Sequence, residues 1–387
     1  MKKTFMKVLG SVVLGSMLLT ACGGNPTQNN TTFKIGVSGP LTGGAAVYGL
    51  GVQNGAALAV KEINDRGGLN GKKFELKAMD DALDTSKAKM NYQSLYEDGM
   101  QVSLGGVTSG CCLEYIKNAV EDKVFCLAPS ATSDKVVETA GVYQMCFSDS
   151  GQGVAAARYI KSEYPTRKIG VLYDSSDDYS NGLFAKFREE YANDNNLVIT
   201  SFTSDTKTNF SAQINSMKNA NVNFVFLPIY YTEAALFITQ AGEANAFSND
   251  TVYYGCDGLD GIESVENFDP YAYQQEISYL SHFNASSEDQ KTASFVAAYT
   301  AAYGVATLNQ FGASAYDCVY AIYQAMYEYE HAGNTIDVTI SAAGLGEILN
   351  AKFSDSNFKF SGVTGTNISW NADRTVNKAP TKYIVNG

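Results

Sequence analysis

The stretch FKIGVSGPLTGGAAVYGLGVQNGAALAVKEINDRGGLNGKKFELKAM, residues 33–79, carries the pattern that decides the fold. It opens with a short apolar run at 33–38 that ends at Gly-Pro. Residues 47–66 then place small and apolar side chains at a helical period and stop at Gly-Gly. Residues 73–79 alternate like a strand. A strand, a helix and a second strand in this order predict a βαβ unit with parallel strands.

The same alternation continues through the rest of the chain. Strand-length apolar runs recur between helix-length amphipathic ones, and after residues 143–147 the series starts again. This order predicts an α/β protein with two lobes of similar build, each a parallel sheet covered by helices on both faces. The further expected strands are 102–104, 124–128, 168–173, 198–202, 224–227 and 252–255, and the further expected helices are 85–98, 113–122, 155–163, 181–193, 212–219, 233–243, 289–303, 314–331 and 342–350.

Composition narrows the classes of function. The chain of 387 residues holds 28 Lys and Arg against 40 Asp and Glu, a formal net charge of −12, whereas a nucleic-acid partner requires a basic face. Its two histidines are His282 and His331, and neither a G-x-S-x-G nor an H-E-x-x-H motif occurs. We therefore expect a protein that is not an enzyme and has no catalytic residues, no metal, no cofactor and no nucleic-acid partner.

The first 22 residues are predicted to be an export signal. A basic region with three lysines precedes the apolar run 8–19, which is too short and wrongly flanked to span a membrane. The end of that run, Leu-Thr-Ala-Cys at 19–22, resembles the bacterial lipobox, in which Cys22 would be lipidated; an ordinary signal peptide is the alternative. Residues 23–32, GGNPTQNNTT, are typical of a flexible tether. We expect an extracytoplasmic protein at the cell envelope, anchored to the membrane by lipid.

Polar side chains follow the expected strands, at the edge of a parallel sheet where ligands bind. In the first lobe, residues 105–110 (GGVTSG) and 129–133 (PSATS) are rich in small hydroxyl residues. In the second lobe, residues 174–179, 230–231 and 256–258 supply tyrosines and aspartates. Hydroxyls and free N–H groups suit a carboxylate, and a buried carboxylate among tyrosine rings suits an ammonium group. The two sets together predict an α-amino acid site between the lobes, with ordinary polar turns as the alternative.

Several segments add a family resemblance to this pattern. The chain contains, in order, GVSGPLTGGAAVYG, AVKEINDRGGLNGKKFEL, DDALDTSKA, LGGVTSG, APSATS, DDYSNGL, YYGCDG and SAYDCVYAIYQA. From about residue 33 to 383 it resembles the bacterial Leu/Ile/Val-binding-protein family. The resemblance implies a type I periplasmic-binding-protein (venus flytrap) fold, two Rossmann-like lobes joined by three crossovers. The N-terminal lobe would comprise 33–149 plus 281–358, and the C-terminal lobe 152–278 plus 361–387.

The resemblance also implies ligand contacts in the first lobe. Ser109 matches the serine that holds the ligand carboxylate through its hydroxyl and N–H. The segment Ser130-Ala131-Thr132 matches the one that binds both the carboxylate and the α-ammonium group. Tyr48 stands at the aromatic position that lines the pocket for the ligand side chain.

The second lobe is expected to supply the remaining contacts. Tyr230 matches a tyrosine near the amino group, and Tyr179 matches one on the far lobe. Asp257 falls where a Glu usually pairs with the ammonium group, so this side chain is one methylene shorter.

The cysteines depart from the family pattern. The positions of the family's disulfide hold Leu83 and Thr108, so that disulfide is expected to be absent, and an unusual Cys111-Cys112 pair follows the Ser109 loop. No C-x-x-C pair occurs among the cysteines beyond residue 22. Most of them are expected to act as small buried apolar residues.

The resemblance implies the solute-binding lipoprotein of an ABC importer. Such a protein captures a small amino acid, with a branched-chain one expected here, by clamshell closure and delivers it to a membrane permease; we expect a monomer. Two alternatives stay open. One is a ligand-sensing lipoprotein of the same fold, and the other is binding of an amide or aromatic acid in place of an aliphatic amino acid.

A dehydrogenase is the weaker rival. Residues 151–156 match the dinucleotide pattern G-x-G-x-x-A, and Asp174 lies about 20 residues further on. However, the segment lies where the family chain would cross into the second lobe, which argues against this interpretation.

Overall fold

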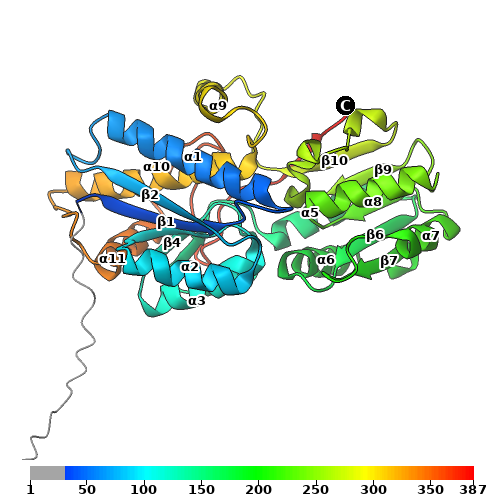
Figure 1. Cartoon of the computed structure of the whole chain (residues 1–387), viewed down its shortest axis with the longest axis horizontal. Helices are drawn as coiled ribbons and strands as arrows, with labels where there is room; N and C mark the ends of the chain where they lie inside the picture. Colours follow the sequence, from blue (N-terminus) through cyan, green and yellow to red (C-terminus); the bar gives the residue numbers. More distant parts are fainter. Residues whose placement is uncertain (1–30) are drawn as a thin grey trace, which may run out of the picture.

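The computed structural model describes residues 31–387, which form two α/β lobes lying side by side (Figure 1). The α/β class with two sheets is confirmed. The expected signal peptide, Cys22 and all of the tether but its last two residues lie outside the described residues.

The first lobe is built on a five-stranded, wholly parallel sheet in the order β2-β1-β3-β4-β5. Burial on both faces explains why its strands read as short apolar runs. Its elements are β1 (Phe33–Gly39), α1 (Ala46–Asp65), β2 (Phe74–Asp80), α2 (Thr85–Glu97), β3 (Val102–Gly106), α3 (Ser109–Glu121), β4 (Phe125–Ala128), α4 (Asp134–Glu138) and β5 (Val142–Gln144).

The second lobe holds a six-stranded sheet in the order β11-β10-β9-β8-β6-β7. All of its neighbours are parallel except β10 and β11, which are antiparallel. Its elements are α5 (Asp149–Glu163), β6 (Ile169–Asp174), α6 (Asp178–Tyr191), β7 (Leu197–Phe202), α7 (Ser211–Asn219), β8 (Phe224–Leu227), α8 (Tyr231–Glu243), β9 (Val252–Gly255), β10 (Glu276–Ser281) and β11 (Thr381–Ile384).

The chain passes between the two sheets three times. It leaves the first sheet after β5, and it returns after β10 through α9 (Gln290–Tyr303) to α10 (Gln310–His331) and α11 (Ala342–Phe353). Helix α10 packs along α1, and α11 packs on β4 (Figure 1). After α11 the chain crosses again and ends with β11 in the second sheet.

The expected helices and strands mostly stand within a few residues of their predicted places. Helices α3 and α10 begin four residues before the expected starts, and α5 begins six residues before, because glycines in the stretches 109–112, 310–313 and 149–154 weaken the helical pattern. The sequence pattern missed α4, β10 and the antiparallel β11. Strand β11 is short and largely exposed, so it lacks the apolar run that marks the buried strands.

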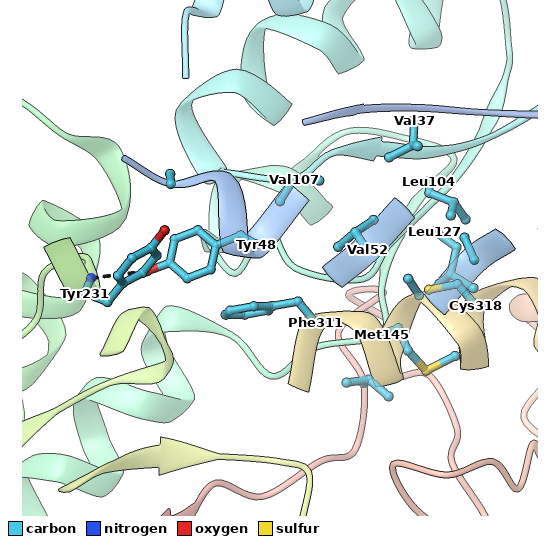
Figure 2. Packing of buried hydrophobic residues seen from close by; sticks show 14 of the residues in the cluster. Val37, Tyr48, Val52, Leu104, Val107, Leu127, Met145, Tyr231, Phe311 and Cys318 are labelled. Carbon is cyan, nitrogen blue, oxygen red and sulfur yellow. Dashed lines mark hydrogen bonds between the residues drawn. The ribbon is translucent and has the colours of Figure 1, made fainter. Parts of the chain in front are cut away.

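The first lobe closes around an apolar core beneath α1 and α10. Val37, Leu104 and Leu127 from the sheet meet Val52 of α1 and Cys318 of α10 (Figure 2). The two helices approach so closely that a Cβ on Gly55 would lie 2.0 Å from the carbonyl oxygen of Gly312. This contact leaves no room for a side chain.

Among residues 31–387, no helix combines the length and the apolar character that crossing a bilayer requires.

Replacement of Gly55 by alanine should destabilise the protein, because the added methyl group would meet backbone that cannot move aside. We expect a loss of about 1–3 kcal/mol in the free energy of unfolding, measured by urea denaturation. Gly110→Ala is the matched control. Gly110 also lies in a helix, α3, but a Cβ there would contact only Thr85 Cγ2, at an ordinary distance of 3.8 Å. Equal effects of the two substitutions would contradict the close-packing explanation.

Candidate functional site

A narrow cavity lies between the two lobes, at the carboxyl ends of the parallel strands. About 230 Å³ is free of protein atoms, and about 20 Å³ of it can be occupied by the centre of a water molecule. The cavity is therefore small, and the side chains of the two lobes enclose it almost completely. It is lined by Tyr48, Val107, Thr108, Ser109, Ser130, Thr132, Tyr179, Tyr230, Asp257, Gly258 and Phe311.

Seven of the eight ligand-contact residues expected from the sequence line this cavity. The exception is Ala131, which is buried with its methyl group in the apolar cluster behind the cavity. The Ala131 carbonyl accepts hydrogen bonds from Gln144 Nε2 at 2.8 Å and from the Cys146 thiol at 3.6 Å. Its backbone thus fixes the segment that presents Ser130 and Thr132.

The first lobe presents hydroxyl groups and a helix start to the cavity. Ser109 is the first residue of α3, where backbone N–H groups have no partner within the helix. Its hydroxyl accepts a hydrogen bond from Ser133 N at 3.3 Å, which leaves its own O–H free to donate. With Ser130 and Thr132 beside it, this wall suits a carboxylate group.

The second lobe presents a carboxylate held by stacked tyrosines. Asp257 follows β9, and its Oδ1 accepts a hydrogen bond from the Tyr179 hydroxyl at 2.7 Å. That hydroxyl also accepts from Gly258 N at 2.7 Å, so it is oriented from both sides. The Tyr179 and Tyr230 rings stack, with centroids 4.9 Å apart and planes 6° from parallel. This wall suits a cation.

Tyr48 joins the two walls. It stands on α1 in the first lobe, and its hydroxyl donates to the carbonyl oxygen of Gly258 at 2.5 Å. The same hydroxyl accepts from Tyr231 N at 3.4 Å (Figure 2). Its ring meets those of Tyr231 and Phe311 edge-on, at centroid distances of 5.0 and 5.1 Å. One side chain therefore bonds across the cleft and caps its apolar end.

The Asp257 carboxylate is buried without a cation. Burial raises its pKa to about 7, against the effect of the Tyr179 hydrogen bond, which lowers it. No lysine or arginine among residues 31–387 forms an ion pair with Asp257. A buried ionised carboxylate in this position needs a positive group from outside the chain.

Two polar residues that the sequence analysis missed stand behind Asp257. Gln152 of α5 accepts a hydrogen bond from Asp257 N at 2.9 Å, while its Nε2 has no partner among the described residues. Asp149, also on α5, is buried with both carboxylate oxygens unpaired. Burial raises the Asp149 pKa well above its usual range, and the Asp257 charge raises it further. Asp257 thus lines the cleft with a second buried carboxyl group behind it, and no lysine or arginine among the described residues forms an ion pair with either one.

Four other lining residues were missed as well: Val107, Thr108, Gly258 and Phe311. Val107, Thr108 and Gly258 lie in the segments 105–110 and 256–258 that the sequence analysis marked, although none of the three was named there as a contact. Phe311 lies at the start of α10, far from any strand that the pattern marked, and only the return of the chain to the first lobe brings it to the site.

The segment with the dinucleotide pattern does not form a strand-to-helix turn. Residues 151–156 lie inside α5, which begins at Asp149 and is capped by the Ser148 hydroxyl accepting from Gly151 N at 3.1 Å. The side chain of Gln152 is engaged with Asp257. The geometry of a pyrophosphate-binding loop is therefore missing here.

The described cysteines beyond residue 31 are all free and buried, as expected of small apolar residues. Within the same residues, no group of three or more His, Cys, Asp or Glu side chains has the arrangement of a metal site.

A larger hollow lies elsewhere, between α1, α9 and α10 of the first lobe, and about 760 Å³ of it can be occupied by the centre of a water molecule, against about 20 Å³ in the interlobe cavity. None of the expected contact residues lines it. Its buried polar groups are satisfied within the chain, since Glu62 accepts hydrogen bonds from the Tyr316 and Tyr320 hydroxyls at 2.8 and 2.7 Å. The smaller cavity, with its unpaired groups, is the stronger candidate for a ligand site.

A family model described as "Periplasmic binding protein" matches residues 32–379, so the chain belongs to that family. Among curated relatives, it is 28 % identical over 289 residues to the leucine-, isoleucine-, valine-, threonine- and alanine-binding protein of Pseudomonas aeruginosa, covering 70 % of this chain and 76 % of that protein. It is 31 % identical over 216 residues to Leu/Ile/Val-binding protein homolog 1 of Brucella abortus, covering 54 % of this chain and 57 % of that protein. The family predicted from the sequence is confirmed.

Solved structures agree with this assignment. The substrate-binding protein LivJ of the branched-chain amino acid transporter of Streptococcus pneumoniae, in complex with isoleucine, aligns with a TM-score of 0.77 and 28 % identity over 92 % of this chain and 96 % of that one. A solute-binding protein of an ABC transporter from Rhodopseudomonas palustris, in complex with 3,4-dihydroxybenzoic acid, aligns at 0.73 with 19 % identity, covering 92 % and 93 %. The second likeness shows the fold alone. The type I periplasmic-binding-protein fold is confirmed, and the chain is a solute-binding protein of the periplasmic-binding-protein family.

Asp257→Asn should stabilise the ligand-free protein at high pH. The folded-state pKa of Asp257 is raised to about 7, above the unfolded value of about 3.9, so its ionisation costs stability progressively between those values. An asparagine avoids that cost and still accepts from Tyr179. We expect the variant to melt at least about 2 °C higher than the native protein at pH 8, with a smaller gain at pH 5.

Differential scanning calorimetry at the two pH values measures this effect. Asp250→Asn serves as control, because its carboxylate is exposed on the same lobe. A variant that is less stable at pH 8 would show that Asp257 is already paired with a cation.

Proposed function

We propose that this protein is the extracytoplasmic solute-binding lipoprotein of an ABC importer for small α-amino acids, branched-chain ones first. The single observation that carries this proposal is the buried Asp257 carboxylate, which lacks a cation and faces the hydroxyl-rich wall of the other lobe. A ligand that satisfies both walls carries one positive and one negative group close together. An α-amino acid does so.

Each charged end of the ligand is proposed to contact one wall of the cavity. The ammonium group pairs with Asp257 below the Tyr179 and Tyr230 rings, and the carboxylate accepts from Ser109, Thr132 and the start of α3. The side chain extends towards Val107, Tyr48 and Phe311. Charge-assisted hydrogen bonds of this kind, with one buried side chain, account for micromolar affinity, about −8 kcal/mol.

The relatives support an aliphatic amino acid over an aromatic acid. LivJ was solved with isoleucine, and the curated relatives are named for leucine, isoleucine and valine, the Pseudomonas protein for threonine and alanine as well. The aromatic acid bound by the Rhodopseudomonas protein carries no cation, so it would leave Asp257 buried and unpaired here. The interlobe carboxylate therefore favours the amino acid.

Capture follows from closure of the lobes. The ligand first meets the hydroxyl wall in the open form, and rotation about the three crossovers brings Tyr179, Tyr230 and Asp257 over it. Only contacts made in the closed form favour closure. The membrane permease then receives the ligand from the closed protein, while the lipid on Cys22 keeps the protein at the membrane. A ligand-sensing lipoprotein of the same fold would share every step but the last.

Removal of the carboxylate should weaken amino-acid binding. We expect Asp257→Ala to reduce the affinity for leucine, isoleucine or valine by at least about tenfold, measured by calorimetry on the chain from residue 23. Asp250→Ala is the matched control on the same lobe. Unchanged affinity in Asp257→Ala would reject the ammonium assignment.

The same pairing predicts a dependence on pH. Since the ammonium group binds the ionised form of a carboxylate whose pKa is about 7, affinity should fall as the pH is lowered below 7, by at most about tenfold per unit for one proton. Asp257→Asn should bind weakly and lose most of this slope. A flat profile from pH 8 to 5 in the native protein would contradict the pairing.

The lipid anchor is tested by Cys22→Ser in the full chain. We expect the native protein in the membrane fraction and the variant in the soluble fraction after export, since the acyl chains alone hold it there. Cys318→Ser, buried within the first lobe, controls for the loss of a cysteine. Equal partition of the native protein and Cys22→Ser would refute the anchor.

A further inference from the structure

One hydroxyl group of the cavity has no partner in the closed structure. Thr108, at the end of β3, lines the cavity and is 5 % exposed, and its Oγ1 forms no hydrogen bond with any described residue. A buried hydroxyl without a partner costs about 1–3 kcal/mol, so such groups are rarely left unused.

The position of Thr108 makes this more unusual. It is the N-cap residue of α3, and a threonine there ordinarily accepts from an N–H group of the first turn. Its side chain makes no such bond here. Burial raises the pKa of the Cys111 thiol, one turn on, and the nearby Thr108 hydroxyl lowers it, yet the two side chains do not reach hydrogen-bond geometry. The hydroxyl is therefore available to the cavity.

A second residue that lines the cavity, Tyr230, also has an unpaired hydroxyl. The Tyr230 Oη is buried without a partner, while its ring stacks on Tyr179 and meets Tyr48 edge-on at 5.7 Å. The rings hold this hydroxyl in place from two sides.

These two hydroxyls exceed what the α-groups of an amino acid require. The ammonium group has Asp257, and the carboxylate has Ser109, Thr132 and the first N–H groups of α3. Thr108 directly follows Val107, at the part of the cavity closed by Tyr48 and Phe311, which is assigned to the ligand side chain. A polar group on that side chain would satisfy them.

We infer that the cleft selects α-amino acids whose side chain carries a hydroxyl group, with Thr108 as the residue that recognises it and the Tyr230 hydroxyl as the second partner. The inference rests on the proposed binding of α-amino acids. It keeps the proposed α-amino-acid site but revises the expected order of ligands: threonine and serine should bind better than valine and alanine, which have nearly the same shapes without the hydroxyl. The narrowness of the cavity agrees with side chains of this size.

The test is calorimetric titration of the chain from residue 23 with L-threonine, L-valine, L-serine and L-alanine. We expect threonine to bind about tenfold or more tightly than valine, and serine more tightly than alanine, because a site built for a hydroxyl rejects the analogue that lacks it. Thr108→Val should remove this preference, and Thr108→Ser should retain it. Tyr230→Phe, which keeps the ring, should also weaken threonine more than valine.

Each other outcome is decisive. Valine binding as tightly as threonine in the native protein overturns the inference and leaves the proposed function standing, with water satisfying Thr108. Equal losses for threonine and valine in Thr108→Val would assign Thr108 to the carboxylate instead and also overturn it. Thermal unfolding of the variants shows that they are folded; if Thr108→Val is not, Tyr230→Phe decides between the same two outcomes. Binding of none of the four, nor of leucine or isoleucine, overturns the proposed function and the inference with it.

Discussion

The buried carboxylate of Asp257 is the constraint on which the cleft depends. It lies at the end of β9, accepts from Tyr179, and is fixed through its own N–H by Gln152 of α5. Asp149 adds a second buried carboxyl group nearby, whose pKa burial raises well above its usual range. Two such groups without a basic partner make the empty closed form costly. A cationic group on a ligand would remove this cost. Asp257 therefore destabilises the empty closed protein and favours binding of a cationic ligand at the same time.

The fold supplies this site by bringing the ends of two parallel sheets together. Serine and threonine follow β3 and β4, whereas tyrosine and aspartate follow β6, β8 and β9. Neither set could bind an amino acid alone, because each complements only one of the two α-charges. The three passages of the chain between the sheets keep the two sets opposite one another, and the return through α10 adds Phe311 to the apolar end.

Much of this could be predicted from the sequence, because parallel strands buried on both faces appear as apolar runs and ligands gather where such strands end. That reasoning marked the segments that hold six of the seven expected lining residues, and the family resemblance named all seven, Tyr48 included; their roles remain proposals. It missed Phe311, since no local pattern shows that α10 returns to the first lobe. It missed Asp149 and Gln152, because a helix start at 149 is not a strand end. Strand β11 escaped because an exposed, short, antiparallel edge strand carries no apolar run.

The hydrogen bond from Tyr48 to Gly258 affects how well a partner protein can distinguish the loaded form of this protein from the empty form. This hydrogen bond joins the two lobes without involving a ligand. It therefore favours the closed form even when no solute is bound. The vacant carrier thus has its own closed population, and any partner that recognises only the shut outline will meet unloaded copies. The unpaired carboxyl groups oppose this hydrogen bond, because their burial destabilises the closed form when no ligand is bound. The balance between the Tyr48–Gly258 hydrogen bond and the unpaired carboxyl groups therefore sets how many empty molecules are closed, and so how well a partner can tell loaded molecules from empty ones.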